Sequence, residues 1–282
     1  MEFHVFLAVL ASAFCHASWN AGLKMRVDPG VAITIVAVAG GVVALPLLAI
    51  TGWPARASWP HLAISTILHV GYFKVLAEAY RAGDLSQVYP IARGTAPLLT
   101  ASGSLLILAE PVAATGVVGI GLLAAGVLLL SMRPGAATLA ALEKRAIGFA
   151  LLTAASIAAY TLVDGRGARA AGDPHAYAVA FFLCNGAMMG AIGLGRQRSQ
   201  IRAALAGGWM IPLGGGVLSF ISYWVALWAM TMAPIALVAA VRESSVLFAA
   251  AIGVVVLKEP LIGSRVVAAC LVLAGLMLIR LS

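Results

Sequence analysis

The chain has 282 residues, of which 62% are apolar and only 10% are charged, whereas a soluble domain carries about 25% charged residues. This apolar content is more than the core of a soluble protein of this length holds, so the composition excludes a soluble domain and predicts an all-α membrane protein. The net charge of +8 lies mostly in short loops. There it suits membrane orientation and anionic headgroups, and we expect lipid rather than nucleic acid as a partner.

Ten apolar runs follow one another along the chain, each close to the ~20 residues that a membrane-spanning helix requires. They cover residues 3–24, 30–51, 59–81, 86–109, 112–132, 146–168, 175–195, 208–232, 235–257 and 261–281. Gly, Pro and Asp mark the breaks, as in Asp28-Pro29-Gly30 and Gly172-Asp173-Pro174. No basic segment precedes the first run, so we expect a retained span rather than a signal peptide.

The longest polar connection, residues 134–145, divides the chain into 1–133 and 146–282, and each part holds five apolar runs. Because five is odd, two equal parts joined end to end cross the membrane in opposite orientations. The sequence therefore predicts ten transmembrane helices arranged as two inverted five-helix repeats around a central cavity. Many transporters are built in this way.

Three features recur in the two halves at a separation of 149 residues. They are Arg93 and Arg242, Glu110-Pro111 and Glu259-Pro260, and Gly126 and Gly275. A charged side chain at the bilayer centre costs about 3 kcal/mol, so a repeated arginine in an apolar helix points to function. We interpret Arg93 and Arg242, with Glu243, as gates or carboxylate anchors beside the cavity. The alternative is a set of structural salt bridges between helices.

Lys74 and Glu78 on the third run are four residues apart and share a helical face. Either the two side chains neutralise each other as a pair, or Glu78 is a group that couples transport to a proton or cation. Glu243 is a second candidate for proton coupling. Pro90 and Pro97 flank Arg93 and predict a kinked or hinged fourth span, because proline removes a backbone donor.

Polar and aromatic side chains complete the predicted cavity wall. His16 and Asn20 belong to a polar stripe with a period of four on the first run, and Tyr160 and Asp164 belong to a similar stripe on the sixth. For His16, and for His69, we expect an interhelical hydrogen bond rather than a proton relay. The residues expected to line the cavity are Trp19, Asn20, Tyr72, Glu78, Tyr80, Tyr89, Arg93, Tyr160, Tyr223, Trp224, Trp228, Arg242 and Glu243. Those expected to gate or couple transport are Lys74, Glu78, Arg93, Arg242 and Glu243.

Each half contains a helix that closes with Glu-Pro, in Leu108-Ala109-Glu110-Pro111 and Leu257-Lys258-Glu259-Pro260, followed by a Gly/Ala-rich span. With ten runs, the whole chain resembles the drug/metabolite transporter superfamily. More narrowly it is similar to EamA-type exporters, which include aromatic amino acid exporters of the YddG type. The resemblance implies ten helices, a central cavity and export of small metabolites by a monomer in a bacterial inner membrane. It also implies termini inside the cell, whereas the basic loops favour termini outside, and the orientation stays open.

We therefore expect a secondary transporter that exports small metabolites, namely aromatic or amphipathic amino acids, by alternating access. A membrane enzyme acting on a lipid-linked substrate is one alternative. However, the ten acidic residues form no DxD or DxxD cluster, and HExxH is absent, so we expect no catalytic residue and no metal site. A solute channel, with non-saturating flux, is the other alternative. The chain has no GxxxxGK[ST] nucleotide motif and its three cysteines lack CxxC spacing, so we expect no cofactor.

Overall fold

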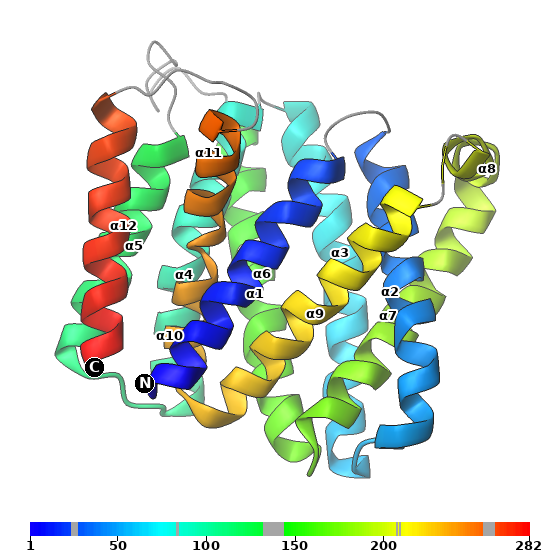
Figure 1. Ribbon diagram of the computed structural model, residues 1–282, viewed down its shortest axis with the longest axis horizontal. Coiled ribbons are helices and arrows are strands. Elements are labelled where there is room, and N and C mark those ends of the chain that lie inside the picture. The colour runs from blue at the N-terminus through cyan, green and yellow to red at the C-terminus, as the bar shows by residue number, and fades with distance from the viewer. Residues whose placement is uncertain (24–27, 83–84, 132–143, 207, 209, 256–262) are drawn as a thin grey trace.

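A computed structural model of the chain is a bundle of helices that run between two opposite faces, with both termini at the same face (Figure 1). It describes residues 1–23, 28–82, 85–131, 144–206, 208, 210–255 and 263–282. The helices are α1 (Phe3–Leu23), α2 (Pro29–Thr51), the short 3-10 helix η1 (Arg56–Ser58), α3 (Trp59–Ala82), α4 (Leu85–Leu108), α5 (Ala114–Ser131), α6 (Lys144–Ala170), α7 (Pro174–Arg196), α8 (Arg198–Ala206), α9 (Met210–Met232), α10 (Ile235–Arg242), α11 (Ser245–Val255) and α12 (Gly263–Leu281). Since these residues include no strand, the all-α prediction is confirmed for the described part of the chain.

The solvent that surrounds this bundle is lipid. Large apolar side chains point outward, and Ile50 and Leu106 are 82% and 81% exposed. In the described residues, eight helical stretches are long and apolar enough to cross a membrane, with α10 and α11 counted together as Ile235–Val255. The apolar helix Ala114–Leu130 is shorter, and α3 is not among the eight. The chain is thus an integral, multi-pass membrane protein, and the number of ten spans stays a prediction.

The predicted apolar runs agree with the helices to within two residues wherever the structure describes their ends. Two features were not predicted. The ninth run is interrupted, because α10 ends at Arg242 and α11 begins at Ser245. In addition, the segment between the seventh and eighth runs forms the nine-residue helix α8. Most of the expected linker, residues 134–145, lies outside the described residues, and its last two residues already belong to α6.

Local sequence signals fix several helix ends. The carboxylate of Asp28 accepts hydrogen bonds from the backbone N–H groups of Gly30 (2.9 Å) and Val31 (3.2 Å) at the start of α2. Asp173 accepts from the N–H of His175 (2.8 Å) at the start of α7. In each case proline follows the aspartate, which suits the first helical position because that N–H would have no partner within the helix.

α5 and α12 pack closely through glycines, and their interface repeats itself under the 149-residue shift. A Cβ on Gly275 would lie 2.7 Å from both the carbonyl oxygen of Gly119 and the nitrogen of Leu123. A Cβ on Gly126 would lie 2.9 Å from the carbonyl oxygen of Ala268 and from the nitrogen of Val272. Gly126 is the counterpart of Gly275, and Gly119 and Leu123 are the counterparts of Ala268 and Val272. Without a hydrophobic drive inside lipid, such close backbone approach is what holds helices together.

The same relationship holds for the rest of the bundle. α2 packs against its own counterpart α7, and the pair formed by α3 and α6 corresponds to the pair formed by α9 and α1. α1 and its counterpart α6 run in opposite directions across the bundle (Figure 1). α4 corresponds to α10 and α11 taken together, and these two counterparts differ in continuity. α4 is continuous from Leu85 to Leu108 despite its two prolines, whereas its counterpart is interrupted, so the helix break occurs in the other half from the predicted kink.

Candidate functional site

Arg93 of α4 reaches the break between α10 and α11. Its Nε lies 2.9 Å from Oε2 of Glu243, and the two side chains are only 12% and 7% exposed. The N–H is not aligned with the oxygen as a hydrogen bond requires, so this contact is an ion pair. A second guanidinium nitrogen donates a hydrogen bond to Oγ of Ser245 at 3.1 Å. The first half of the chain is thereby joined to the second half deep inside the bundle.

The backbone at the break explains why Glu243 stands apart from either helix. The N–H groups of Glu243, Ser244 and Val246 each donate to a carbonyl three residues earlier, at 3.0 Å. This tighter 3-10 spacing replaces the regular i to i−4 ladder. Interrupted helices of this kind commonly form binding sites in membrane transporters, because the irregular backbone lines protein rather than lipid.

Arg242 lies next to this ion pair but makes a different contact. Its guanidinium carbon is 5.0 Å from the ring centroid of Tyr223 on α9, a cation–π arrangement. Among the described residues Arg242 forms no ion pair, and its Nε is buried without a hydrogen-bond partner. We call Arg93, Arg242, Glu243 and Ser245 the central cluster. The structure thus brings the two predicted arginines to one place, at the break between α10 and α11.

An aromatic row extends from the central cluster. The ring centroids of Tyr223 and of His69 on α3 are 6.0 Å apart, and those of His69 and Tyr160 are 4.1 Å apart. Tyr160 is in turn 5.7 Å from Tyr72 in an edge-to-face arrangement. Tyr160 also interacts electrostatically with both arginines of the central cluster. Three of the predicted cavity residues are therefore linked, with His69 between them. An interhelical hydrogen bond was expected for His69, but its described hydrogen bonds go to Ser65 of the same helix.

On α1, His16 interacts electrostatically with both arginines. Trp19 contacts it edge to face at 5.4 Å, and the Trp19 Nε1 is buried with no hydrogen-bond partner among the described residues. Asn20 instead donates to the backbone carbonyl of His16 at 2.8 Å. Trp19 therefore remains a candidate donor to a ligand, whereas the amide of Asn20 is engaged with its own helix.

Several predicted residues lie away from the central cluster. Glu78 pairs with Arg81 at 2.6 Å and with Arg145 at 3.8 Å. Lys74 is exposed and forms no ion pair with any described residue. Of the two alternatives, the Lys74–Glu78 pair is not formed among the described residues, because Arg81 and Arg145 pair with the carboxylate instead. The side chains of Tyr80 and Tyr89 lie outside the described part of the structure.

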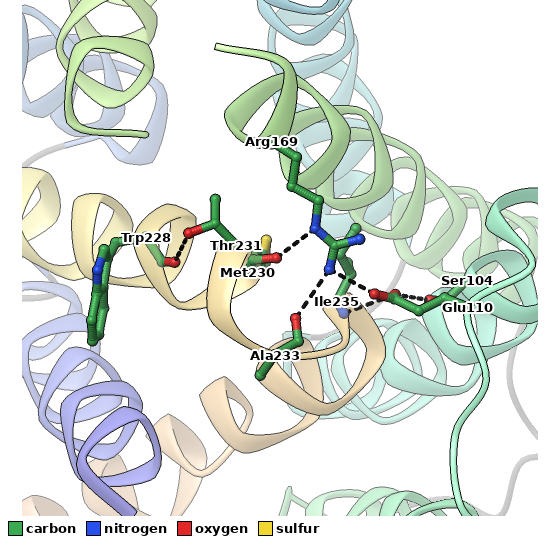
Figure 2. Close-up of polar contacts among 8 residues, drawn as sticks. All are labelled: Ser104, Glu110, Arg169, Trp228, Met230, Thr231, Ala233 and Ile235. Carbon is green, nitrogen blue, oxygen red and sulfur yellow. Dashed lines mark hydrogen bonds and ion pairs between the residues drawn. The ribbon is translucent and has the colours of Figure 1, made fainter. Parts of the chain in front are cut away.

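The predicted tryptophans of α9 also lie elsewhere. Trp224 donates from Nε1 to Nδ1 of His175 at 2.7 Å, in the interface with α7. Trp228 lies beside His4 at the beginning of α1, with ring centroids 6.2 Å apart. Its backbone carbonyl accepts a hydrogen bond from Thr231 at 2.7 Å (Figure 2). Neither ring contacts the central cluster directly among the described residues, although Phe220 and Phe182 link Trp224 to Tyr223.

The Glu-Pro motif of the first half has a role that its sequence did not show. Oε2 of Glu110 accepts from Oγ of Ser104 at 2.6 Å and from the backbone N–H of Ile235 at 3.0 Å. Its Oε1 pairs with Arg169 at 2.6 Å. Arg169 also donates to the carbonyls of Met230 (2.8 Å) and Ala233 (3.1 Å), as Figure 2 shows. We call this set the Glu110 junction.

The Glu110 junction satisfies both ends of the turn between α9 and α10. The carboxylate caps the N-terminus of α10, and the guanidinium caps the C-terminal carbonyls of α9, so each charge meets the helix-dipole end of opposite sign. Ala109 has a φ of 51°, which turns the chain so that the Glu110 N–H reaches the Ser104 carbonyl at 3.1 Å. The counterpart motif at Glu259-Pro260 lies outside the described residues.

Asp164 was not among the residues predicted to line the cavity. It is fully buried on α6 and accepts hydrogen bonds from the hydroxyls of Tyr223 (2.5 Å) and Tyr177 (2.9 Å). Its position in a polar stripe was the one available sequence signal, but its partners lie on two other helices. Among the described residues, no group of three His, Cys, Asp or Glu side chains is placed to hold a metal ion.

Comparisons with known proteins agree with this architecture. A solved structure described only as "Crystal structure of protein" superposes with a TM-score of 0.78 at 17% identity, over 98% of this chain and 95% of that one. At this identity the likeness shows the fold alone. No curated protein matches the sequence. The EamA-like transporter family matches twice, over residues 3–132 and 144–281. The chain therefore belongs to the EamA-like transporter family, whose members are membrane transporters of small solutes.

Proposed function

We propose that this protein is a secondary transporter that exports small metabolites bearing a carboxylate, with aromatic or amphipathic amino acids as the solute class. Two inverted halves of five spans each would expose the central cluster to the two sides of the membrane in turn. The doubled family match and the repeated α5–α12 interface support this arrangement. We also propose, from the resemblance to bacterial exporters, a monomer in a bacterial inner membrane.

We include α3 among the proposed spans, although it is not among the helices that are both long and apolar enough to cross a membrane. It has 24 residues, which gives about 36 Å at 1.5 Å per residue and exceeds the ~30 Å hydrocarbon core. Its lower hydropathy comes from polar side chains such as His69, Lys74 and Glu78. His69 is buried in the aromatic row. A span with one polar face toward the protein interior is what a solute pathway requires.

The observation that carries the proposal is a set of buried donors around the helix break that have no hydrogen-bond partner among the described residues. They are Nε of Arg242 and Oγ of Ser244 at the break itself, and Nε1 of Trp19, whose ring contacts His16 on α1. Buried polar groups in proteins are nearly always hydrogen-bonded, so a cluster of orphan donors indicates a place where a ligand supplies the acceptor. An anionic group with several oxygens, such as a carboxylate, fits three donors of this kind.

The charged groups nearby also suit a zwitterionic solute, which carries an ammonium group as well as a carboxylate. The carboxylate of an amino acid would bind Arg242, whose planar guanidinium offers two parallel N–H groups. Its ammonium would compete with Arg93 for Glu243, and its side chain would lie against the aromatic row of Tyr160 and Tyr72. Aromatic rings with a polar tip recognise flat or amphipathic solutes. The arrangement therefore favours amino acids over sugars, which carry no charge to match either group.

The test is counterflow in proteoliposomes, with L-phenylalanine inside and trace labelled L-phenylalanine outside. Arg242→Gln should abolish accumulation, and Arg242→Lys should lower its rate at least tenfold because a point charge cannot replace a bidentate contact. Arg198→Gln in the exposed helix α8 is the matched control and should leave the rate unchanged. Arg242 is a better position for this test than Arg93. Removing Arg93 would leave Glu243 unpaired, which would also destabilise the protein by about 3–5 kcal/mol.

Two results would contradict the proposal. Wild-type counterflow by Arg242→Gln would remove this residue from the solute site. Flux that rises linearly with solute concentration and shows no counterflow would indicate a channel. The enzyme alternative has no support from the family, whose members transport solutes.

A further inference from the structure

Asp164 is a buried carboxylate whose hydrogen-bond donors are neutral. Its side chain is 0% exposed, and each carboxylate oxygen accepts from one tyrosine hydroxyl, Tyr177 on α7 and Tyr223 on α9. Among the described residues, the ion pairs made by arginines go to Glu78, Glu110 and Glu243, and none goes to Asp164. A charge buried without a paired cation is costly, and an ionisable group inside a membrane protein is a functional candidate by default.

The side chain of Tyr223 connects Asp164 to the central cluster. The Tyr223 hydroxyl donates to Asp164 at 2.5 Å, and the face of the same ring lies against the Arg242 guanidinium at 5.0 Å. The state of the carboxylate therefore influences the arginine to which the proposed function assigns the solute carboxylate. No such direct connection joins Glu78 to the central cluster, because Glu78 pairs with Arg81 and Arg145 at a helix end.

Several helices packed against α6 carry titratable or charged groups that lie near Asp164. α3 contributes His69, which interacts with it electrostatically. α4 contributes Arg93, which is paired with Glu243, and η1 contributes the exposed Arg56. Further titratable or charged groups among the described residues are Tyr160 one turn earlier on α6, Tyr177 and its neighbour Cys184 on α7, Tyr223 on α9, and Arg242 on α10. Arg166 on α6 is exposed.

Position along the helix supplies access from one side. Asp164 lies six residues before the last residue of α6, which places it about 9 Å from that end of the helix. This end of α6 lies at the face that carries both termini (Figure 1). In the proposed mechanism the proton reaches Asp164 from this face, and the solute binds at the helix break.

We propose that Asp164 is the proton-binding site of this transporter and that its proton moves in the same direction as the solute; this rests on the proposed function. Proton binding forms one O–H bond on the carboxylate and involves no other reactant. With Asp164 ionised, Arg93 and Arg242 are balanced by two carboxylates. With Asp164 protonated, Glu243 alone remains, so the central cluster gains one positive charge and binds a solute carboxylate more tightly.

A purely structural role makes a different prediction. If Asp164 only held α6, α7 and α9 together, an asparagine of the same shape would replace it in every respect, since its amide can accept and donate to the tyrosine hydroxyls. If it binds a proton, asparagine mimics the neutral form permanently. Solute exchange then continues while proton movement stops.

The experiment uses the full chain in proteoliposomes that contain a pH-sensitive dye and an outward gradient of L-phenylalanine. Wild-type protein should make the lumen alkaline as solute and protons leave together. Asp164→Asn should keep counterflow of labelled L-phenylalanine but reduce the pH change at least tenfold. Glu2→Gln, which removes an exposed carboxylate, is the matched control and should behave as wild type.

Three results would overturn the proton site: a full pH change in Asp164→Asn, a lumen that becomes acidic as the solute leaves, or loss of the pH change in Glu78→Gln instead.

Absence of wild-type L-phenylalanine counterflow would contradict the proposed solute class, and infrared difference spectra then test the proton site separately. Acidification of wild-type protein in lipid should produce a protonated-carboxyl band that Tyr177→Phe shifts, because that hydroxyl contacts Asp164. This measurement also serves if Asp164→Asn does not fold, and an unshifted band overturns the proposal.

Discussion

Replacing Glu110 by alanine tests whether the Glu-Pro motif stabilises the contact between the two halves. The substitution removes the acceptor for three donors: Oγ of Ser104, the backbone N–H of Ile235 and the guanidinium of Arg169. Ile235 is fully buried, so its N–H loses its partner without gaining water. We therefore expect a larger loss of stability than from the same substitution at the more exposed Glu78.

The magnitude follows from exposure. A hydrogen bond to a charged group contributes about 1.5–3 kcal/mol, and such contributions do not add fully at one side chain. Glu110 is 13% exposed, but Arg169 is 36% exposed, so the ion pair itself is screened and adds little. We therefore expect Glu110→Ala to lower the free energy of unfolding by about 3–4 kcal/mol. Glu110→Gln keeps a neutral acceptor and should cost about half as much.

Glu78→Ala is the matched control, because it also removes a glutamate that pairs with arginine. Glu78 is 35% exposed, and its partners Arg81 and Arg145 are 75% and 70% exposed. Exposed pairs of this kind contribute about 0–1 kcal/mol. Reversible unfolding of the purified proteins in mixed micelles measures both values. The reasoning is refuted if Glu78→Ala costs as much as Glu110→Ala, or if Glu110→Ala unfolds within about 1 kcal/mol of wild type.

Two further predictions concern backbone geometry and use the same unfolding measurement. Gly119→Ala should lower stability by about 1–3 kcal/mol, because its Cβ would lie 2.9 Å from the Gly275 carbonyl oxygen. Gly121→Ala on the same helix, where a Cβ meets open space, should be neutral or raise stability by up to about 1 kcal/mol. Equal effects at both positions would contradict close packing of α5 on α12. Ala109→Gly should raise stability by about 1 kcal/mol, since Ala109 has a φ of 51°; a loss of stability would show that its methyl group packs usefully.

Spacing along the sequence correctly predicted which side chains share a face of one helix. It did not predict side-chain partners that come from other helices. The four-residue separation of Lys74 and Glu78 correctly places them on one helical face. It does not reveal that Arg145 approaches from α6, or that Arg81 takes the same carboxylate at 2.6 Å. The partners of Asp164 were hidden for the same reason, because Tyr177 and Tyr223 lie on α7 and α9.

The interruption between α10 and α11 could not be predicted from local signals. Neither helix contains proline, and the residues at the break, Glu243 and Ser244, are not the usual helix breakers. The prolines that predicted a kink lie instead in α4, which is continuous. The break therefore depends on what surrounds it, including the pairing of Arg93 with Glu243.

The sequence alone predicted a helical membrane protein, most helix ends to within two residues, and a 149-residue repeat shared by two halves, but not α8 or the break between α10 and α11. It did so because the free energy of placing a helix in lipid depends on the composition of that helix alone. The packing of the helices brings Arg93 and Arg242 together at one helix break, Glu110 to Arg169, and Asp164 to the hydroxyl of Tyr223. These contacts join side chains from different helices, and their distances depend on how the helices pack rather than on their separation in the chain.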